Sequence, residues 1–169
     1  YDSCRLMLVN LTSFVQNAWQ NDAEFDWPKF GSVVMKAQRL MDDMIDLEIE
    51  QVDKILTKIN NDPEPTSVKQ IERELWHKVR KIAINGRRTG LGITGLGDAL
   101  AMLGIQYGSE ESIDATEKIY KMLAVNSYSS SIVLAKERGA FPIFDYEKEK
   151  GHELINRSRD FFTVSLILL

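Results

Sequence analysis

The chain has 169 residues, of which 44% are hydrophobic and 27% are charged, and its formal net charge is −4. These values are ordinary for one soluble globular domain or a large piece of one, and the length suffices to bury a substantial core. The negative balance argues against a general nucleic-acid binder, which usually carries a basic stripe. The sequence has no apolar run near the ~18 residues of a membrane span and no signal-peptide pattern, so we expect neither a membrane nor a nucleic acid as partner.

Cys4 is the only cysteine, which excludes a disulfide or a multi-cysteine zinc site within the chain. A single free cysteine suits a reducing compartment, so we expect the cytoplasm. Two interpretations of this residue stand. It is a small buried hydrophobe at the start of a strand, which the surrounding apolar run favours, or it is half of a redox pair whose partner lies outside this chain.

The first expected elements are a strand and a long helix. Residues 5–15 are rich in Leu, Val and Phe and predict a mostly buried strand. A polar loop over residues 17–26 follows. Asp26 is a good helix cap and Pro28 fits a first helical turn. Apolar residues then recur at helical spacing, which predicts an amphipathic helix that ends near Asn60.

Three further helices are expected. The second begins after the breaker at residues 60–65, with Ser67 as cap, Gln70 as its capping-box partner and Gly86 as the left-handed end. The third covers residues 93–103 and the fourth residues 112–138. The predicted fold is therefore mainly α, with one N-terminal strand and about four helices. A lone strand leaves its backbone groups unpaired, so it requires partner strands from elsewhere.

The glycine-rich stretch at residues 86–98 formally matches a dinucleotide fingerprint, with Gly90, Gly92 and Gly95 in the required spacing. That fingerprint works only where a strand leads into the glycines. The preceding residues have helical periodicity instead. We therefore expect the glycines to serve close packing of two helices, or of a helix and a loop, with Thr89 or Thr94 capping the next helix.

Charged residues offer weaker signals. Arg87 and Arg88 can hold a phosphate or pair with the acidic face of the long helix, and the ion-pair interpretation is favoured. Asp42 and Asp46 lie four residues apart, but a di-iron site also needs Glu-x-x-His motifs that this sequence lacks. We expect a solvated helix face and no metal. For the isolated histidines, His77 and His152, surface or packing roles are expected.

Three segments, occurring in the same order along the chain, together resemble the large chain of ribonucleotide reductases. They are YDSCRLMLVNL at residues 1–11, GRRTGLGITGLGDALA at residues 86–101 and LAKERGAFP at residues 134–142. The first is most similar to the adenosylcobalamin (vitamin B12)-dependent class. The resemblance, together with the missing initial methionine, predicts that residues 1–156 are a piece from the C-terminal half of the catalytic barrel. Residues 157–169 depart from the pattern and are expected to be a divergent or truncated tail.

The resemblance implies that the whole enzyme is a ten-stranded α/β barrel that converts ribonucleotides to 2′-deoxyribonucleotides by thiyl-radical chemistry. It implies that Cys4 is one of the reducing dithiol pair, which a thioredoxin-like protein or a small dithiol restores. Adenosylcobalamin is implied for the full enzyme rather than for this piece, and the remainder of the reductase chain is an implied partner. The isolated chain is expected to be inactive.

Two rival functions remain at this point. One is a helical interaction module, or a split-gene subunit that completes a barrel with another chain. The other is a dinucleotide-binding oxidoreductase, which rests on the glycine spacing alone.

Overall fold

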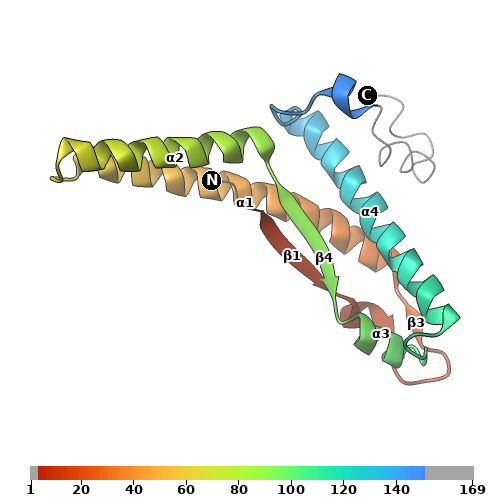
Figure 1. Cartoon of the computed structure of the whole chain (residues 1–169). Coiled ribbons are helices and arrows are strands. Elements are labelled where there is room, and N and C mark those ends of the chain that lie inside the picture. Colours follow the sequence, from red (N-terminus) through yellow and green to blue (C-terminus); the bar gives the residue numbers. More distant parts are fainter. Residues whose placement is uncertain (1–3, 151–169) are drawn as a thin grey trace.

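The computed structural model describes residues 4–150 (Figure 1). Two short strands and a 3-10 helix separate the first strand from the long helices. The elements in chain order are β1 (Arg5–Asn10), η1 (Leu11–Phe14), β2 (Val15–Gln16), β3 (Glu24–Phe25), α1 (Trp27–Asn61), α2 (Thr66–Gly86), β4 (Thr89–Thr94), α3 (Leu96–Met102), α4 (Glu110–Arg138) and α5 (Tyr146–Glu149). The mainly helical fold is confirmed.

The first strand has a partner within the chain. β1 pairs in parallel with β4, from Arg5 opposite Thr89 to Asn10 opposite Thr94. The two strands lie side by side in Figure 1, and the α1–α2 hairpin connects them and extends well beyond them. The expectation of a lone strand was therefore wrong. Each strand still has one edge without a partner strand among residues 4–150.

The glycine-rich stretch forms β4, where a turn and the start of a helix were predicted. Leu91 and Ile93 pack against the core, whereas Gly90 and Gly92 face the other side of the sheet, toward Leu6 and Leu8 of β1. Glycine at alternate positions has low strand propensity, which masks the alternation that Leu91 and Ile93 provide. Because β4 continues to Thr94, α3 starts at residue 96 rather than at the predicted residue 93.

The start of α1 is confirmed, because the Asp26 side chain accepts a hydrogen bond from the backbone N–H of Lys29. The expected capping of α2 is wrong. Its cap is Pro65, with no side-chain hydrogen bond, and its left-handed end is Arg87, with φ of 40°, rather than Gly86. An arginine in this conformation costs backbone energy, so other contacts must hold it.

β1 is shorter than the predicted strand because Asn10 turns the chain. Its Oδ1 accepts hydrogen bonds from the backbone N–H and the hydroxyl of Thr12, at 3.2 and 2.9 Å. This caps η1, and the short antiparallel pair of β2 and β3 follows within the segment expected to be strand end and loop.

The core lies between the helix-facing side of the sheet, α1 and α4. Its buried residues are Val9, Leu11, Phe14, Phe25, Phe30, Val34, Ala37, Ala99, Ile119 and Leu123. The rings of Phe14, Phe25 and Phe30 meet at centroid distances of 5.2 to 5.9 Å, within the range of favourable aromatic pairs. None of the helices within residues 4–150 has both the length and the apolar character that a bilayer crossing requires.

Gly95 is the glycine whose backbone conformation restricts substitution in this stretch. It lies just before α3 with φ of 73°, and an added Cβ would stand 2.8 Å from Asn10 Oδ1. Gly95→Ala is expected to lower the free energy of unfolding by about 1–2 kcal/mol, the cost of a left-handed non-glycine residue. Denaturant unfolding of the 169-residue chain measures the effect.

Gly97→Ala is the matched control for Gly95→Ala. Gly97 lies in α3 with open space around its Cα, and alanine there is expected to be neutral or to stabilise by up to about 1 kcal/mol. Equal unfolding midpoints for the two variants would contradict the assignment of Gly95 to the strained position.

Candidate active site

Cys4 lies directly before β1, and its free thiol is exposed. The interpretation of this residue as a buried hydrophobe is therefore wrong. A buried cysteine is inert packing material, whereas an exposed one is open to exchange with another sulfur. The structure thus leaves Cys4 available for chemistry, and its surroundings determine which partners can reach it.

The sheet face that carries Cys4 is open. Leu6 and Leu8 follow on the same face of β1 and are 73% and 62% exposed. The alternate residues, Arg5 and Val9, are buried on the opposite face, which α1 covers. Among residues 4–150 no helix covers the Cys4 face, so this apolar surface ends in an accessible thiol.

On β4, the residues beside these leucines are glycines. In the parallel register Leu6 lies opposite Gly90 and Leu8 opposite Gly92. A Cβ at Gly90 would lie 2.6 Å from Leu6 Cδ2 and 3.1 Å from Cys4 Sγ, and a Cβ at Gly92 would lie 2.8 Å from Leu8 Cδ2. The glycines therefore make room for β1 side chains, where close packing involving a helix was expected. Because the first two glycines lie within a strand, they do not form the phosphate-binding turn of a dinucleotide fold.

The amino end of the sheet is fixed to α1. Arg5, which follows Cys4, donates from its side-chain Nε to Glu48 of α1 at 2.6 Å. Its backbone N–H donates to the carbonyl of Arg88. Arg5 is 7% exposed, so this ion pair is shielded from solvent more than a surface pair. The position of the thiol thus depends on contacts with both α1 and β4.

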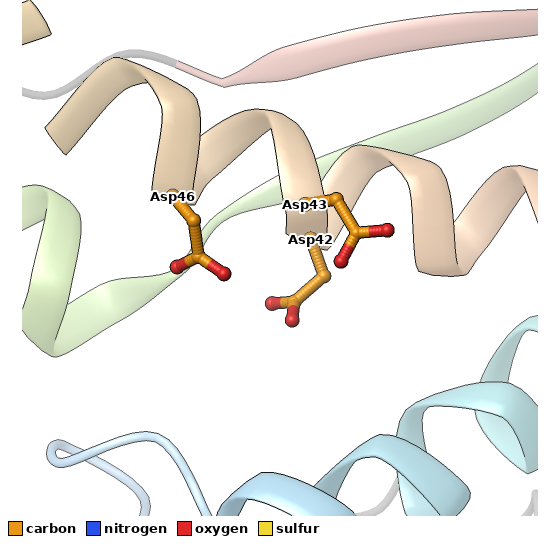
Figure 2. Close-up of side chains that lie close together, drawn as sticks. All are labelled: Asp42, Asp43 and Asp46. Carbon is orange, nitrogen blue, oxygen red and sulfur yellow. The ribbon is translucent and has the colours of Figure 1, made fainter. Parts of the chain in front are cut away.

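A second set of ion pairs lies nearby and joins α1, the α2–β4 junction and α4. Figure 2 shows Asp42, Asp43 and Asp46 on the same side of the α1 ribbon. Arg87 donates to Asp42 Oδ1 at 2.7 Å, to the Asp42 carbonyl at 2.9 Å and to Asp46 at 2.8 Å. Arg138, at the end of α4, donates to Asp42 Oδ2 and to Asp43, both at 2.6 Å.

These contacts confirm the ion-pair interpretation for Arg87. The prediction of a solvated helix face is wrong for Asp42, which is buried, whereas Asp46 is exposed. Partial burial alone would lower the pKa of the Arg87 guanidinium. Hydrogen bonds to Asp42 and Asp46, together with their charges, outweigh this effect and raise the pKa above its usual value. The three carboxylates approach within 4.8 Å of one another. Arg87 and Arg138 together contact all three carboxylates, so the cluster is an ion-pair network. The expectation that it holds no metal stays a prediction. His77 is exposed on α2, and His152 lies outside the described residues.

The fold joins a strand, a helical hairpin and a second, parallel strand, with an exposed thiol on the uncovered face of the sheet. The chain belongs to the ribonucleotide reductase family: the family model described as "Ribonucleotide reductase, barrel domain" matches residues 1–159. The match includes Cys4, the glycine-rich strand and α4. The divergent tail expected from residue 157 lies outside the described residues.

Relatives agree with this assignment. The chain is 32% identical over 144 residues to a vitamin B12-dependent ribonucleoside-diphosphate reductase of Mycobacterium tuberculosis, and 29% identical over 152 residues to one of Thermoplasma acidophilum. These alignments cover 85% and 88% of this chain but 17% and 16% of the relatives. A ribonucleoside-diphosphate reductase subunit alpha of Chlamydia pneumoniae is 26% identical over 150 residues. The chain therefore spans about a sixth of the length of the two vitamin B12-dependent relatives and 12% of the Chlamydia subunit.

Proposed function

We propose that this chain supplies part of the catalytic barrel of a ribonucleotide reductase and that Cys4 is one of its two reducing thiols. The observation that carries the proposal is the exposed thiol of Cys4 on an uncovered sheet face, within a segment that matches the family. In the complete enzyme this face points into a ten-stranded barrel, where the substrate is held. The names of the relatives make a ribonucleoside diphosphate the proposed substrate.

The proposed chemistry needs a second sulfur. Replacing the 2′-hydroxyl by hydrogen consumes two electrons and two protons and releases water. Two thiols supply both as they become one disulfide, and exchange with an external thiol restores them. Cys4 is the only cysteine of these 169 residues, so the second thiol and the cysteine that bears the thiyl radical come from the rest of the reductase. The isolated chain is accordingly proposed to be inactive. A thioredoxin-like protein or a dithiol is the proposed reductant, which suits a reducing compartment such as the cytoplasm.

Adenosylcobalamin is the proposed radical source of the whole enzyme, because two relatives are named as vitamin B12-dependent. The described residues do not fit this cofactor. Two cavities of about 360 and 340 Å³ lie at the end of α2 and between α1, β4 and α4. A drug-sized ligand already takes about 300–1,000 Å³, and a corrin ring with its nucleotide and adenosyl arms is far larger. No part of the reaction argued for Cys4 runs through the cofactor.

A single-turnover experiment on the complete reductase tests the role of Cys4. The reduced enzyme is freed of external dithiol, given substrate and radical cofactor, and then alkylated. Cys4 is expected to disappear from the thiol pool in step with product, at about one equivalent per deoxyribonucleotide, because each turnover forms one disulfide. Mass spectrometry of the alkylated peptides measures this loss. If product forms and all of the Cys4 can still be alkylated afterwards, the proposal is refuted.

A further inference from the structure

Gly90 lacks a side chain for a reason other than its backbone conformation. Within residues 4–150 the glycines with left-handed φ are at positions 95, 104, 108 and 139, and Gly90 is not among them. Its Cα instead borders the thiol, since an added Cβ would stand 3.1 Å from Cys4 Sγ. Steric room beside the sulfur is therefore what glycine provides at this position.

That room matters for disulfide chemistry. A second sulfur must come to about 2.05 Å from Cys4 Sγ to form the bond, with a defined torsion about it. It must also reach the thiol across the open face of the sheet, because α1 covers the opposite face. An alanine methyl at position 90 would fill the space between Cys4 and the tip of Leu6, which it would approach to 2.6 Å.

We propose that Gly90 is a positioning residue that keeps the β4 side of the Cys4 thiol open to an incoming sulfur. This inference rests on the proposed role of Cys4. In the forward direction two thiols lose two electrons and two protons as one S–S bond forms. In the reverse direction an incoming thiolate attacks one sulfur of the disulfide, and the other sulfur leaves as a thiolate. Both directions need an unobstructed approach to Sγ.

The single cysteine makes the test specific. Reaction of the 169-residue chain with an aromatic disulfide reagent such as 5,5′-dithiobis(2-nitrobenzoate) reports on Cys4 alone. Gly90→Ala is expected to slow this reaction about threefold or more, because exchange rates depend on access to the sulfur. Gly92→Ala is the matched control. It lies on the same strand and face, contacts Leu8 instead of Cys4, and should leave the rate unchanged.

A second reagent and a second background exclude a simple loss of structure. The small reagent iodoacetamide should be slowed less than the disulfide reagent, whereas unfolding would slow neither, because it leaves the thiol open to solvent. In a Leu6→Ala background the 2.6 Å clash is removed and the exposed Leu6 site tolerates truncation, yet Gly90→Ala should still slow the disulfide reaction. The inference would be overturned if Gly90→Ala reacted with the disulfide reagent as fast as Gly92→Ala. It would also be overturned if Gly90→Ala left the rate of the Leu6→Ala variant unchanged. Neither result bears on whether Cys4 turns over in the complete enzyme.

Discussion

Replacing Cys4 by serine in the complete reductase is expected to lower the steady-state rate of deoxyribonucleotide formation by about a thousandfold or more, as loss of a chemically essential group does. Serine can donate a proton, but it cannot form the disulfide that carries two electrons. Because the Cys4 side chain is exposed, the added hydroxyl remains hydrated. The free energy of unfolding should therefore change by no more than about 0.5 kcal/mol.

The rate must be normalised to folded protein, and substrate binding should stay close to that of the parent enzyme, since Cys4 is not proposed to hold the phosphates. Ile71→Ala is the control, because Ile71 lies on α2, away from the sheet face that carries Cys4, and is 71% exposed. It is expected to keep most of the turnover. A Cys4→Ser rate within about a factor of two of the parent would refute the redox role, because an obligatory reductant is worth orders of magnitude.

The long helices were predictable because their signals are local. Asp26 caps α1, apolar residues recur at helical spacing along it, and the boundary at Asn61 is close to the predicted one. α4 begins at Glu110 with Ser109 as cap, slightly before the predicted start. Each of these features depends on residues within a few positions of one another. Sequence reasoning performs well on such features.

β4 was missed because its identity depends on a partner strand 84 positions earlier in the register, such as Leu6 opposite Gly90. Glycines at alternate positions have low strand propensity and no apolar face of their own. The leucines that fill this face come from β1. A signal was present in Leu91 and Ile93, which alternate with the glycines, but it becomes informative only when the two strands are paired.

In the active site too, some features were predicted from the sequence and others were missed. Composition around Cys4 favoured burial, and only the family resemblance assigned it a redox role. Pairing of Arg87 with the acidic face of α1 was predicted from charge. Arg138 was missed as a partner of Asp42, because 96 residues separate them in the chain. Long-range ion pairs of this kind leave no local pattern.

The ion-pair network at Asp42 carries the largest expected effect on stability. Asp42 uses one carboxylate oxygen for Arg87 and the other for Arg138. In Asp42→Asn the amide keeps one acceptor oxygen and turns an N–H₂ donor toward the other arginine. Breaking a fully buried ion pair costs about 3–5 kcal/mol, and because Arg138 is 34% exposed we expect about 2–3 kcal/mol here. Arg87, whose backbone is left-handed, would lose one of its contacts but keep Asp46 and the Asp42 carbonyl.

Asp43→Asn is the matched control for this prediction. Asp43 is the adjacent residue, its side chain is 45% exposed, and it pairs with Arg138. The change should cost less than about 1 kcal/mol, as for other exposed ion pairs. Denaturant unfolding of the two variants in the same buffer measures the difference. Equal midpoints would contradict a central role for Asp42. If the prediction holds, high salt should lower the cost of Asp42→Asn only slightly, because a buried carboxylate is screened less than an exposed one.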